Sequence, residues 1–248
     1  MIRPDEKETL TLSLGELQLW LLEPQEVERF AEEGEAWLAV EERLRADIFP
    51  RAQQRQRYVG RRAALRRILG RYTGLAPQSL PLMVKASGKP YLAGDLAAPQ
   101  FSVSASEGWT LIAVCDDQAV GVDVERFQAG LDSQAIASSF FDPVECLFLE
   151  RAKPQEREQL FFRAWTRAEA WLKMTGKGLA GLEALATFSR PRQLWLRDLK
   201  VPEGFYGALC LAAAPTAVRW MAYPGLLQPG PAIEDPSLSL SPLQLLEA

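Results

Sequence analysis

The order in which helical and strand patterns follow one another constrains the fold of this chain most strongly. Apolar residues recur with helical spacing over residues 26–48 and 51–72, and strand-like runs follow them. The same order then repeats, because a strong helical pattern over residues 155–175 is followed by further strand-like runs. A parallel sheet would need strands and helices that alternate one by one. The sequence therefore predicts an α+β fold with two halves.

The limits of these segments are set by residues that break helices and form turns. Pro50 ends the first helical pattern, and Gly176 ends the last one. Two β-rich runs, Trp109 to Cys115 and Ala119 to Glu125, flank Asp116-Asp117-Gln118, which predicts a hairpin. We expect one half over residues 1–117, a second half over 118–225 and a proline-rich tail over 226–248 that is poorly ordered or lies on the surface. Further strands are expected at 16–22 and 82–84, and an antiparallel sheet is expected from 187–189, 193–197, 207–213 and 218–223.

The 248 residues include no histidine, and this absence excludes several kinds of chemistry. A Ser-His-Asp triad, a Cys-His pair, a zinc ion held by histidine and an imidazole proton shuttle are all ruled out. Carboxylates must therefore carry out any proton transfer or metal binding. Lysine, arginine or backbone N–H groups must recognise any phosphate.

The remaining composition is that of an ordinary globular protein that works in the cytoplasm. The three cysteines, Cys115, Cys146 and Cys210, form no C-x-x-C motif, which argues against a disulfide framework. The first residues are acidic, unlike a signal peptide, and no apolar run reaches the length of a membrane span. We expect a cytoplasmic monomer that does not bind membranes.

Two acids separated by one residue, Asp123 and Glu125, lie in a β-rich run. Side chains at positions i and i+2 of a strand point to the same face, so the two carboxylates would lie side by side. A pair of hard oxygen ligands suits Mg²⁺, which proteins usually hold with one or two carboxylates and substrate phosphates. The alternative is an exposed edge strand with ordinary surface acids.

A third acid, Glu169, falls within the apolar arc of the helical segment 155–175. A buried charge there needs a partner or a cation. Two structural roles compete with a ligand role: a capping box with Thr166, and an ion pair with Lys173 at the favourable i, i+4 spacing. The glycine-rich exit from this helix, Gly176-Lys-Gly178, fits either close approach of a ligand or a plain helix ending.

Taken in order, these motifs resemble the 4′-phosphopantetheinyl transferase superfamily, in particular its surfactin-synthetase-activating (Sfp-type) branch. The resemblance covers roughly residues 15–225. It is carried by Gly88-Lys89-Pro90, Gly121-Val-Asp123-Val-Glu125, the arginine-rich helix over residues 51–71 and Trp165-Thr-Arg-Ala-Glu169-Ala-Trp-Leu-Lys173-Met-Thr-Gly176-Lys-Gly178-Leu179.

The resemblance implies a pseudo-twofold fold and a holo-[acyl-carrier-protein] synthase type of activity. Such an enzyme transfers 4′-phosphopantetheine from coenzyme A to a serine of an apo acyl or peptidyl carrier protein. By position, Asp123, Glu125 and Glu169 would bind Mg²⁺, and Glu169 and Lys173 would be catalytic. Coenzyme A would be bound by Arg57, Lys89, Ser104 and Lys173.

The sequence departs from the family pattern at three positions: Ser102 stands where the family has an asparagine, and alanine occupies the other two. Ala105 stands where the family has a phosphate-contacting histidine, and Ala168 stands where it has a lysine. Both changes remove hydrogen-bond donors from the implied phosphate site. The alternative function is therefore a non-catalytic or specialised relative that binds coenzyme A or carrier domains.

The arginine-rich helix also raises the question of nucleic-acid binding. Arginine occupies positions 51, 55, 57, 61, 62, 66, 67 and 71, without an acidic residue between them. The whole chain is acidic, with a formal net charge of −4, and its aromatic residues are not interleaved with these arginines. We therefore expect no nucleic-acid partner, and we expect this helix to pack against the acidic segment 26–48.

Overall fold

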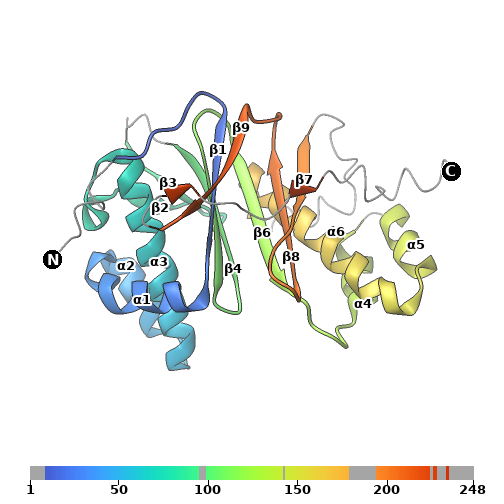
Figure 1. The fold of residues 1–248 in the computed structure, drawn as a ribbon. Coiled ribbons are helices and arrows are strands. Elements are labelled where there is room, and N and C mark those ends of the chain that lie inside the picture. Colours follow the sequence, from blue (N-terminus) through green and yellow to red (C-terminus); the bar gives the residue numbers. More distant parts are fainter. Residues whose placement is uncertain are drawn as a thin grey trace. The chain divides into compact units, whose positions relative to one another are not determined.

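The computed structural model describes residues 9–94, 99–141, 143–178, 194–223, 226–227 and 233–234. Contacts divide the chain into two compact units. The first unit comprises Met1–Lys85, Pro90–Gln118 and Pro215–Gly230, and the second comprises Ala86–Lys89, Ala119–Ala214 and Pro231–Ala248. Each unit contains helices and a mainly antiparallel sheet, so the α+β class is confirmed (Figure 1).

The first unit is built on a five-stranded sheet in the order β10-β9-β1-β5-β4. The strand β1 pairs antiparallel with β5 and parallel with β9. The strands are β1 (Glu16–Leu22), β4 (Gln100–Ser106), β5 (Trp109–Cys115), β9 (Ala217–Ala222) and β10 (Leu226–Leu227). The short pair β2 (Leu82–Val84) and β3 (Pro90–Leu92) and the 3-10 turn η3 (Pro77–Ser79) complete the unit's strands and turns.

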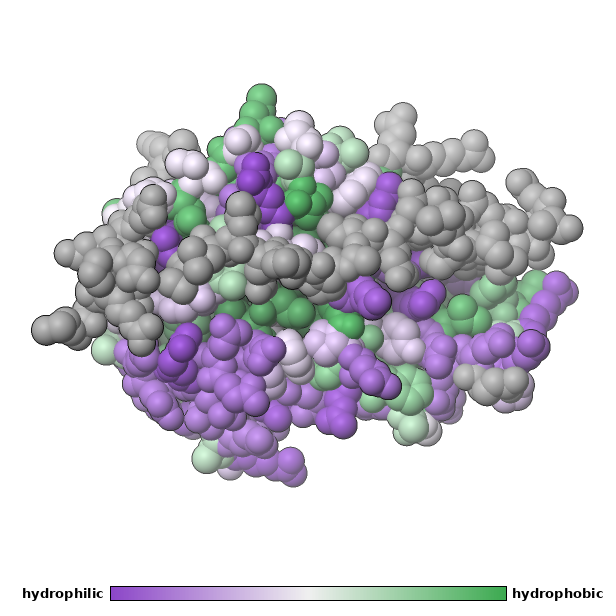
Figure 2. Space-filling model, viewed as in Figure 1, coloured by the Kyte–Doolittle hydropathy of each residue, from purple (hydrophilic) through white to green (hydrophobic). Residues whose placement is uncertain are grey.

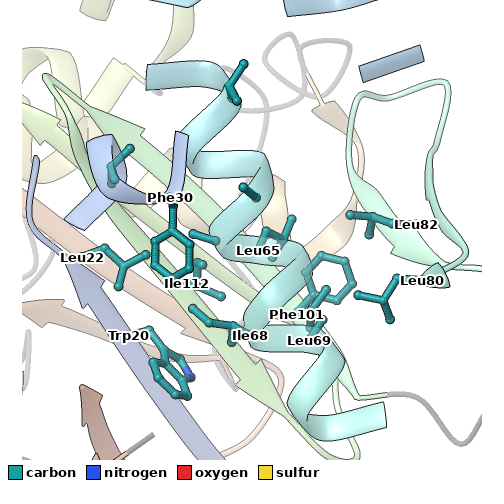
Figure 3. Close-up of a cluster of buried hydrophobic side chains, with 14 of the residues drawn as sticks. Trp20, Leu22, Phe30, Leu65, Ile68, Leu69, Leu80, Leu82, Phe101 and Ile112 are labelled. Atoms are coloured by element: carbon teal, nitrogen blue, oxygen red, sulfur yellow. The ribbon is translucent and has the colours of Figure 1, made fainter. Parts of the chain in front are cut away.

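Helices α1 (Pro24–Gly34), α2 (Val40–Asp47) and α3 (Ala52–Thr73) lie together on one side of this sheet (Figure 1). Apolar side chains of α3 meet those of β1, β4 and β5 in a core that includes Trp20, Leu65, Ile68 and Ile112 (Figure 3). The outward surface of α1 and α2 is largely hydrophilic (Figure 2). This division of polarity is what an amphipathic helical layer over a sheet requires.

Several arginines of α3 form ion pairs with acids and therefore do not make an open basic surface. Arg62 and Arg66 are buried, and both form ion pairs with the buried Glu42 of α2. Arg66 also donates to the carbonyl oxygens of Pro77 and Leu80. The expected packing of this helix against the acidic segment is thus confirmed.

The second unit contains a four-stranded antiparallel sheet in the order β11-β7-β8-β6. Its strands are β6 (Val120–Arg126), β7 (Trp195–Leu199), β8 (Phe205–Leu211) and β11 (Ile233–Glu234). The long helix α6 (Pro154–Thr175) packs on β6 and β8, and α4 (Ser133–Phe140) and α5 (Pro143–Arg151) precede it. The helix α6 ends at Gly176 with φ of 70°, which confirms the helix end predicted from the glycine at this position.

The predicted hairpin between residues 109–115 and 119–125 is wrong. The strand β5 pairs with β1 on one edge and β4 on the other, whereas β6 pairs with β8 in the second unit. A strand has only two edges for backbone hydrogen bonds, and both edges of β5 are taken. The tight turn instead joins β4 to β5, with positive φ at Glu107 and Gly108.

Two other expectations are corrected by the structure. The helix expected over 26–48 is broken after Gly34, because a 3-10 turn (η2, Glu35–Trp37) lets Leu38 enter the core and α2 begins anew at Val40. The strand near residues 218–223 was expected in the second half, but β9 joins the first unit by parallel pairing with β1. The expected strand at 187–189 and most of the tail lie outside the described residues.

No helix among the described residues combines the length and the apolar character needed to cross a membrane.

A buried polar chain in the first unit gives a test of its packing. Trp20 Nε1 donates to Tyr72 Oη over 3.0 Å, and Tyr72 Oη donates to Gln18 Oε1 over 2.5 Å. Burial raises the pKa of Tyr72 well above its ordinary value, so the phenol stays protonated. We expect Tyr72→Phe to lower the free energy of unfolding by about 1–3 kcal/mol, because buried groups of Trp20 and Gln18 lose their partner.

Urea unfolding would measure this loss, with Tyr91→Phe as the matched control. The ring of Tyr91 lies beneath the Lys85 ammonium, and that contact survives removal of the hydroxyl. The control should change stability by no more than about 0.5 kcal/mol. Equal losses in the two variants would contradict the proposed hydrogen-bond chain.

Candidate functional site

The functional side chains of the second unit are brought together by the close packing of α6 on β6. A Cβ atom added to Gly121 would lie 1.9 Å from the carbonyl oxygen of Ala170 and 2.3 Å from the amide nitrogen of Met174. Only glycine allows the two backbones to approach this closely. The strand residues that follow Gly121 therefore lie directly against α6.

Asp123 is the most buried acid of this site, with its side chain 1% exposed. Its Oδ1 atom accepts a hydrogen bond from Lys173 Nζ over 2.6 Å. The Lys173 side chain is 30% exposed, so its ammonium reaches from solvent to the buried carboxylate. The structure thus joins β6 and α6 by a charge-assisted hydrogen bond, which is a strong kind.

Glu169 lies one turn before Lys173 on α6 and is electrostatically linked to both charged groups. Burial raises the pKa of Glu169, and the negative charge of Asp123 raises it further, whereas the Lys173 ammonium lowers it. The i, i+4 interaction expected between Glu169 and Lys173 is present as this electrostatic effect of the Lys173 ammonium on the pKa of Glu169. Two carboxylates and one ammonium consequently share a single partly buried site.

Glu125 follows Asp123 on the same face of β6 and is half-buried. Among the described residues, however, no three acidic or cysteine side chains are already grouped as a metal cage. The carboxylates of Asp123, Glu125 and Glu169 can still suit Mg²⁺ without forming a complete cage, because this ion is commonly held by one or two carboxylates together with substrate phosphates. The cation-binding character of Asp123 is visible in its bond to the Lys173 ammonium.

Lys89 also belongs to the second unit, although its sequence neighbours from Pro90 onward belong to the first. Its Nζ atom donates to the carbonyl oxygens of Val120, Lys173 and Met174. The predicted site residue Lys89 is therefore adjacent to the backbone of Lys173. Arg57 and Ser104 belong to the first unit: Arg57 Nη1 donates to Glu107 Oε2 over 2.9 Å, and Ser104 is buried on β4.

Two features of the site were missed by reasoning from sequence. The motif that contains Gly121 predicts a carboxylate pair and not a close contact, although a glycine within a β-rich run is a signal of close backbone approach. The buried pair of Arg167 on α6 and Asp198 on β7 forms two hydrogen bonds of 2.6 Å. Nothing in the sequence relates these two residues, because 31 positions separate them.

Comparison with known proteins gives the family. A family model described as the 4′-phosphopantetheinyl transferase superfamily matches residues 119–200, which include Asp123, Glu125, Glu169 and Lys173. The chain is 34% identical over 187 residues to the 4′-phosphopantetheinyl transferase HetI of Nostoc sp. (strain PCC 7120), covering 74% of this chain and 78% of HetI. The chain belongs to the 4′-phosphopantetheinyl transferase superfamily.

Other members of the superfamily match most of the chain. The 4′-phosphopantetheinyl transferase Sfp of Bacillus subtilis (strain 168) is 27% identical over 221 residues, covering 83% of this chain and 95% of Sfp. The 4′-phosphopantetheinyl transferase psf-1 of Bacillus pumilus is 29% identical over 183 residues, covering 73% of this chain and 77% of psf-1. These matches support the Sfp-type branch of the superfamily.

The two alanines of this superfamily member lie in different environments. Ala168 is 4% exposed and packs in an apolar cluster with Trp171 and Cys210. Ala105 is half-buried on β4 and pairs with Thr110 of β5. The position before Glu169 thus contributes to the core of the second unit in this chain.

The raised pKa of Glu169 predicts how this transferase-family chain responds to pH without metal. The folded state binds a proton at Glu169 more tightly than the unfolded chain does, so this contribution to stability is present below the unfolded pKa and is lost as pH rises through the folded pKa. Glu169→Gln removes a buried charge beside Asp123. We expect the melting temperature at pH 8 to rise by roughly 2–4 °C, the shift that about 1 kcal/mol produces in a chain of this size.

Differential scanning calorimetry in the presence of a chelator would test this expectation. At a pH well below the unfolded pKa the carboxyl is protonated in both states, and the difference between the two proteins should vanish. The exposed acid Glu203 provides the control, because Glu203→Gln should leave the melting temperature unchanged at both pH values. A lower melting temperature of Glu169→Gln at pH 8 would contradict the electrostatic argument.

Proposed function

We propose that this protein transfers 4′-phosphopantetheine from coenzyme A to a serine of an apo acyl or peptidyl carrier protein. The observation that carries the proposal is the position of the site: the part of the chain matched by the family model contains the packed β6–α6 pair with Asp123, Glu169 and Lys173. HetI, Sfp and psf-1 are named as 4′-phosphopantetheinyl transferases, which supports the transferred group.

The reaction requires one phosphoryl transfer and one proton transfer. The carrier serine Oγ forms a bond to the phosphorus next to pantetheine, and the bond from that phosphorus to the bridging oxygen breaks, releasing adenosine 3′,5′-bisphosphate. The serine proton passes to Glu169, directly or through a water molecule. The position of Glu169 favours this role, because its carboxylate lies partly buried on α6 beside Asp123 and Lys173.

Asp123, Glu125 and Glu169 would hold Mg²⁺ in the working enzyme. When bound, the ion would neutralise negative charge on the pyrophosphate of coenzyme A. Lys173 would add a positive charge from α6, since its ammonium already lies at Asp123. Arg57 would bind the 3′-phosphate of coenzyme A by exchanging its surface partner Glu107, and Ser104 would contribute a hydroxyl donor.

Mass spectrometry of carrier proteins tests the proposed function. Purified protein is incubated with coenzyme A, Mg²⁺ and a panel of apo carriers from fatty-acid, polyketide and nonribosomal-peptide systems. We expect at least one carrier to gain the mass of phosphopantetheine, and its serine-to-alanine variant to gain none. Coenzyme A binding without a mass gain on any carrier would instead support the non-catalytic alternative.

The panel also tests the narrower assignment as a holo-[acyl-carrier-protein] synthase, which predicts modification of the fatty-acid carrier. We further propose that the protein works in the cytoplasm. We propose that it does so as a monomer, because both units of the fold belong to one chain. Light scattering coupled to size-exclusion chromatography should give the mass of one chain, 27.6 kDa.

A further inference from the structure

The turn that contains Lys89 lies against the end of α6. Gly176 has φ of 70°, and a Cβ atom there would lie 3.5 Å from Lys89 Cδ. Gly178 has φ of 59°, and a Cβ atom there would lie 2.5 Å from the carbonyl oxygen of Ser87. Gly178 therefore makes room for the backbone of Ser87, and both glycines adopt the left-handed backbone of the helix exit.

The ammonium of Lys89 is placed where the helix most needs a donor. The last carbonyl groups of an α-helix have no partner within the helix and carry its partial negative charge. Lys89 Nζ donates to Lys173 O over 2.5 Å and to Met174 O over 3.2 Å, in the last turn of α6. It also donates to Val120 O over 3.3 Å, at the start of β6.

These three carbonyl groups match the three N–H donors of an ammonium group. They also come from the two elements that carry the site, since β6 supplies Asp123 and α6 supplies Lys173. Lys89 therefore bridges β6 and α6, and its acceptors lie close in sequence to the two residues of the Asp123–Lys173 ion pair. Lys89 is half-buried, so this bridge is partly shielded from water.

We infer that Lys89 is a positioning residue, which holds the end of α6 on β6 so that Lys173 and Asp123 meet. This differs from the phosphate-binding role that the family resemblance implies for Lys89. As far as it concerns catalysis, the inference rests on the proposed transfer function. The structural part, the attachment of α6 to β6, does not depend on that function.

Hydrogen–deuterium exchange of the unliganded protein tests the structural part. Lys89→Met keeps the length of the side chain and removes its charge and donors. We expect the amides from Met174 to Gly176 to exchange about tenfold faster, as loss of a charge-assisted hydrogen bond predicts, and the amides of α3 to be unchanged. Lys85→Met is the matched control, because Lys85 is exposed in the same loop region. Unchanged exchange at the end of α6 in Lys89→Met would overturn the inference.

Steady-state kinetics and calorimetry separate positioning from phosphate binding. If Lys89 acts through Lys173 and Asp123, Lys89→Met should lower kcat about tenfold while the Kd for coenzyme A changes less than about twofold. Lys89→Arg, which keeps the charge and its donors, should recover most of kcat. A raised Kd with normal kcat would show a direct phosphate contact and overturn the inference. If the unaltered protein transfers nothing, the proposed function fails, and the exchange experiment still decides the structural role.

Discussion

Replacing Asp123 by asparagine is expected to lower the rate of phosphopantetheine transfer by at least roughly a hundredfold, the loss typical of removing one preorganised electrostatic group from an active site. The change keeps the shape of the side chain but removes its negative charge. Under the proposed function, the neutral amide at this position would bind Mg²⁺ poorly, and it would no longer hold the Lys173 ammonium as an ion pair. The rate is measured as mass gain of an apo carrier at saturating coenzyme A and Mg²⁺.

The fold should tolerate this substitution better than the activity does. Lys173 is 30% exposed, so water can solvate its ammonium when the partner is neutral. The control is Asp116→Asn, an exposed acid shortly before β6, which should retain the full rate. If Asp123→Asn is folded and keeps more than half of the rate, Asp123 has no part in the reaction.

A second consequence of Asp123→Asn concerns Glu169. The negative charge of Asp123 is one of the causes that raise the pKa of Glu169, so its removal should lower that pKa. In the metal-free protein, the carboxyl of Glu169 should then release its proton at a lower pH than in the unaltered protein. Infrared titration of the carboxyl in the presence of a chelator reports this shift, and an unchanged titration would argue against the electrostatic coupling of Glu169 to Asp123.

Much of the second unit could be predicted because its signals are local. The helix α6 has a periodic apolar face, begins at Pro154 and ends at a left-handed glycine, all of which are set by nearby residues. The same helical spacing placed Glu169 inside the apolar arc, and burial does raise its pKa. Local rules therefore identified which acid was unusual and where it lies.

Strand partners could not be predicted in the same way. The runs that form β5 and β6 are both almost completely buried, and a buried apolar run carries no mark of the strand it will pair with. The parallel pairing of β9 with β1 joins residues about 200 positions apart. Such pairings are decided by competition among all strands for free edges, which a single sequence does not display.

The site shows the same limit on a smaller scale. Spacing on one helix predicted that Lys173 would interact with Glu169, but its bond to Asp123 depends on how α6 lies across β6. The role of Lys89 depends on the same packing, since its three acceptors come from two elements. Both contacts exist because Gly121 lets the helix approach the strand.

Gly121→Ala is therefore expected to have the second large effect, this time on both folding and activity. The added Cβ would overlap backbone atoms of Ala170 and Met174, at 1.9 and 2.3 Å, and backbone atoms cannot rotate away as a side chain can. Overpacking of this kind costs about 1–3 kcal/mol or more. We expect the melting temperature to fall by roughly 5–10 °C. Displacement of α6 by about 1 Å would also separate Lys173 from Asp123 and lower the transfer rate roughly a hundredfold.

Gly130→Ala is the matched control, because Gly130 has open space around it and only a positive φ of 76°. Its cost is limited to backbone strain of about 1–2 kcal/mol, and transfer should be unaffected. Calorimetry gives the melting temperatures, and hydrogen exchange at the end of α6 reports displacement of the helix. A Gly121→Ala protein as stable and as active as Gly130→Ala would show that α6 need not lie so close to β6, and the geometric basis assigned to the site would then be wrong.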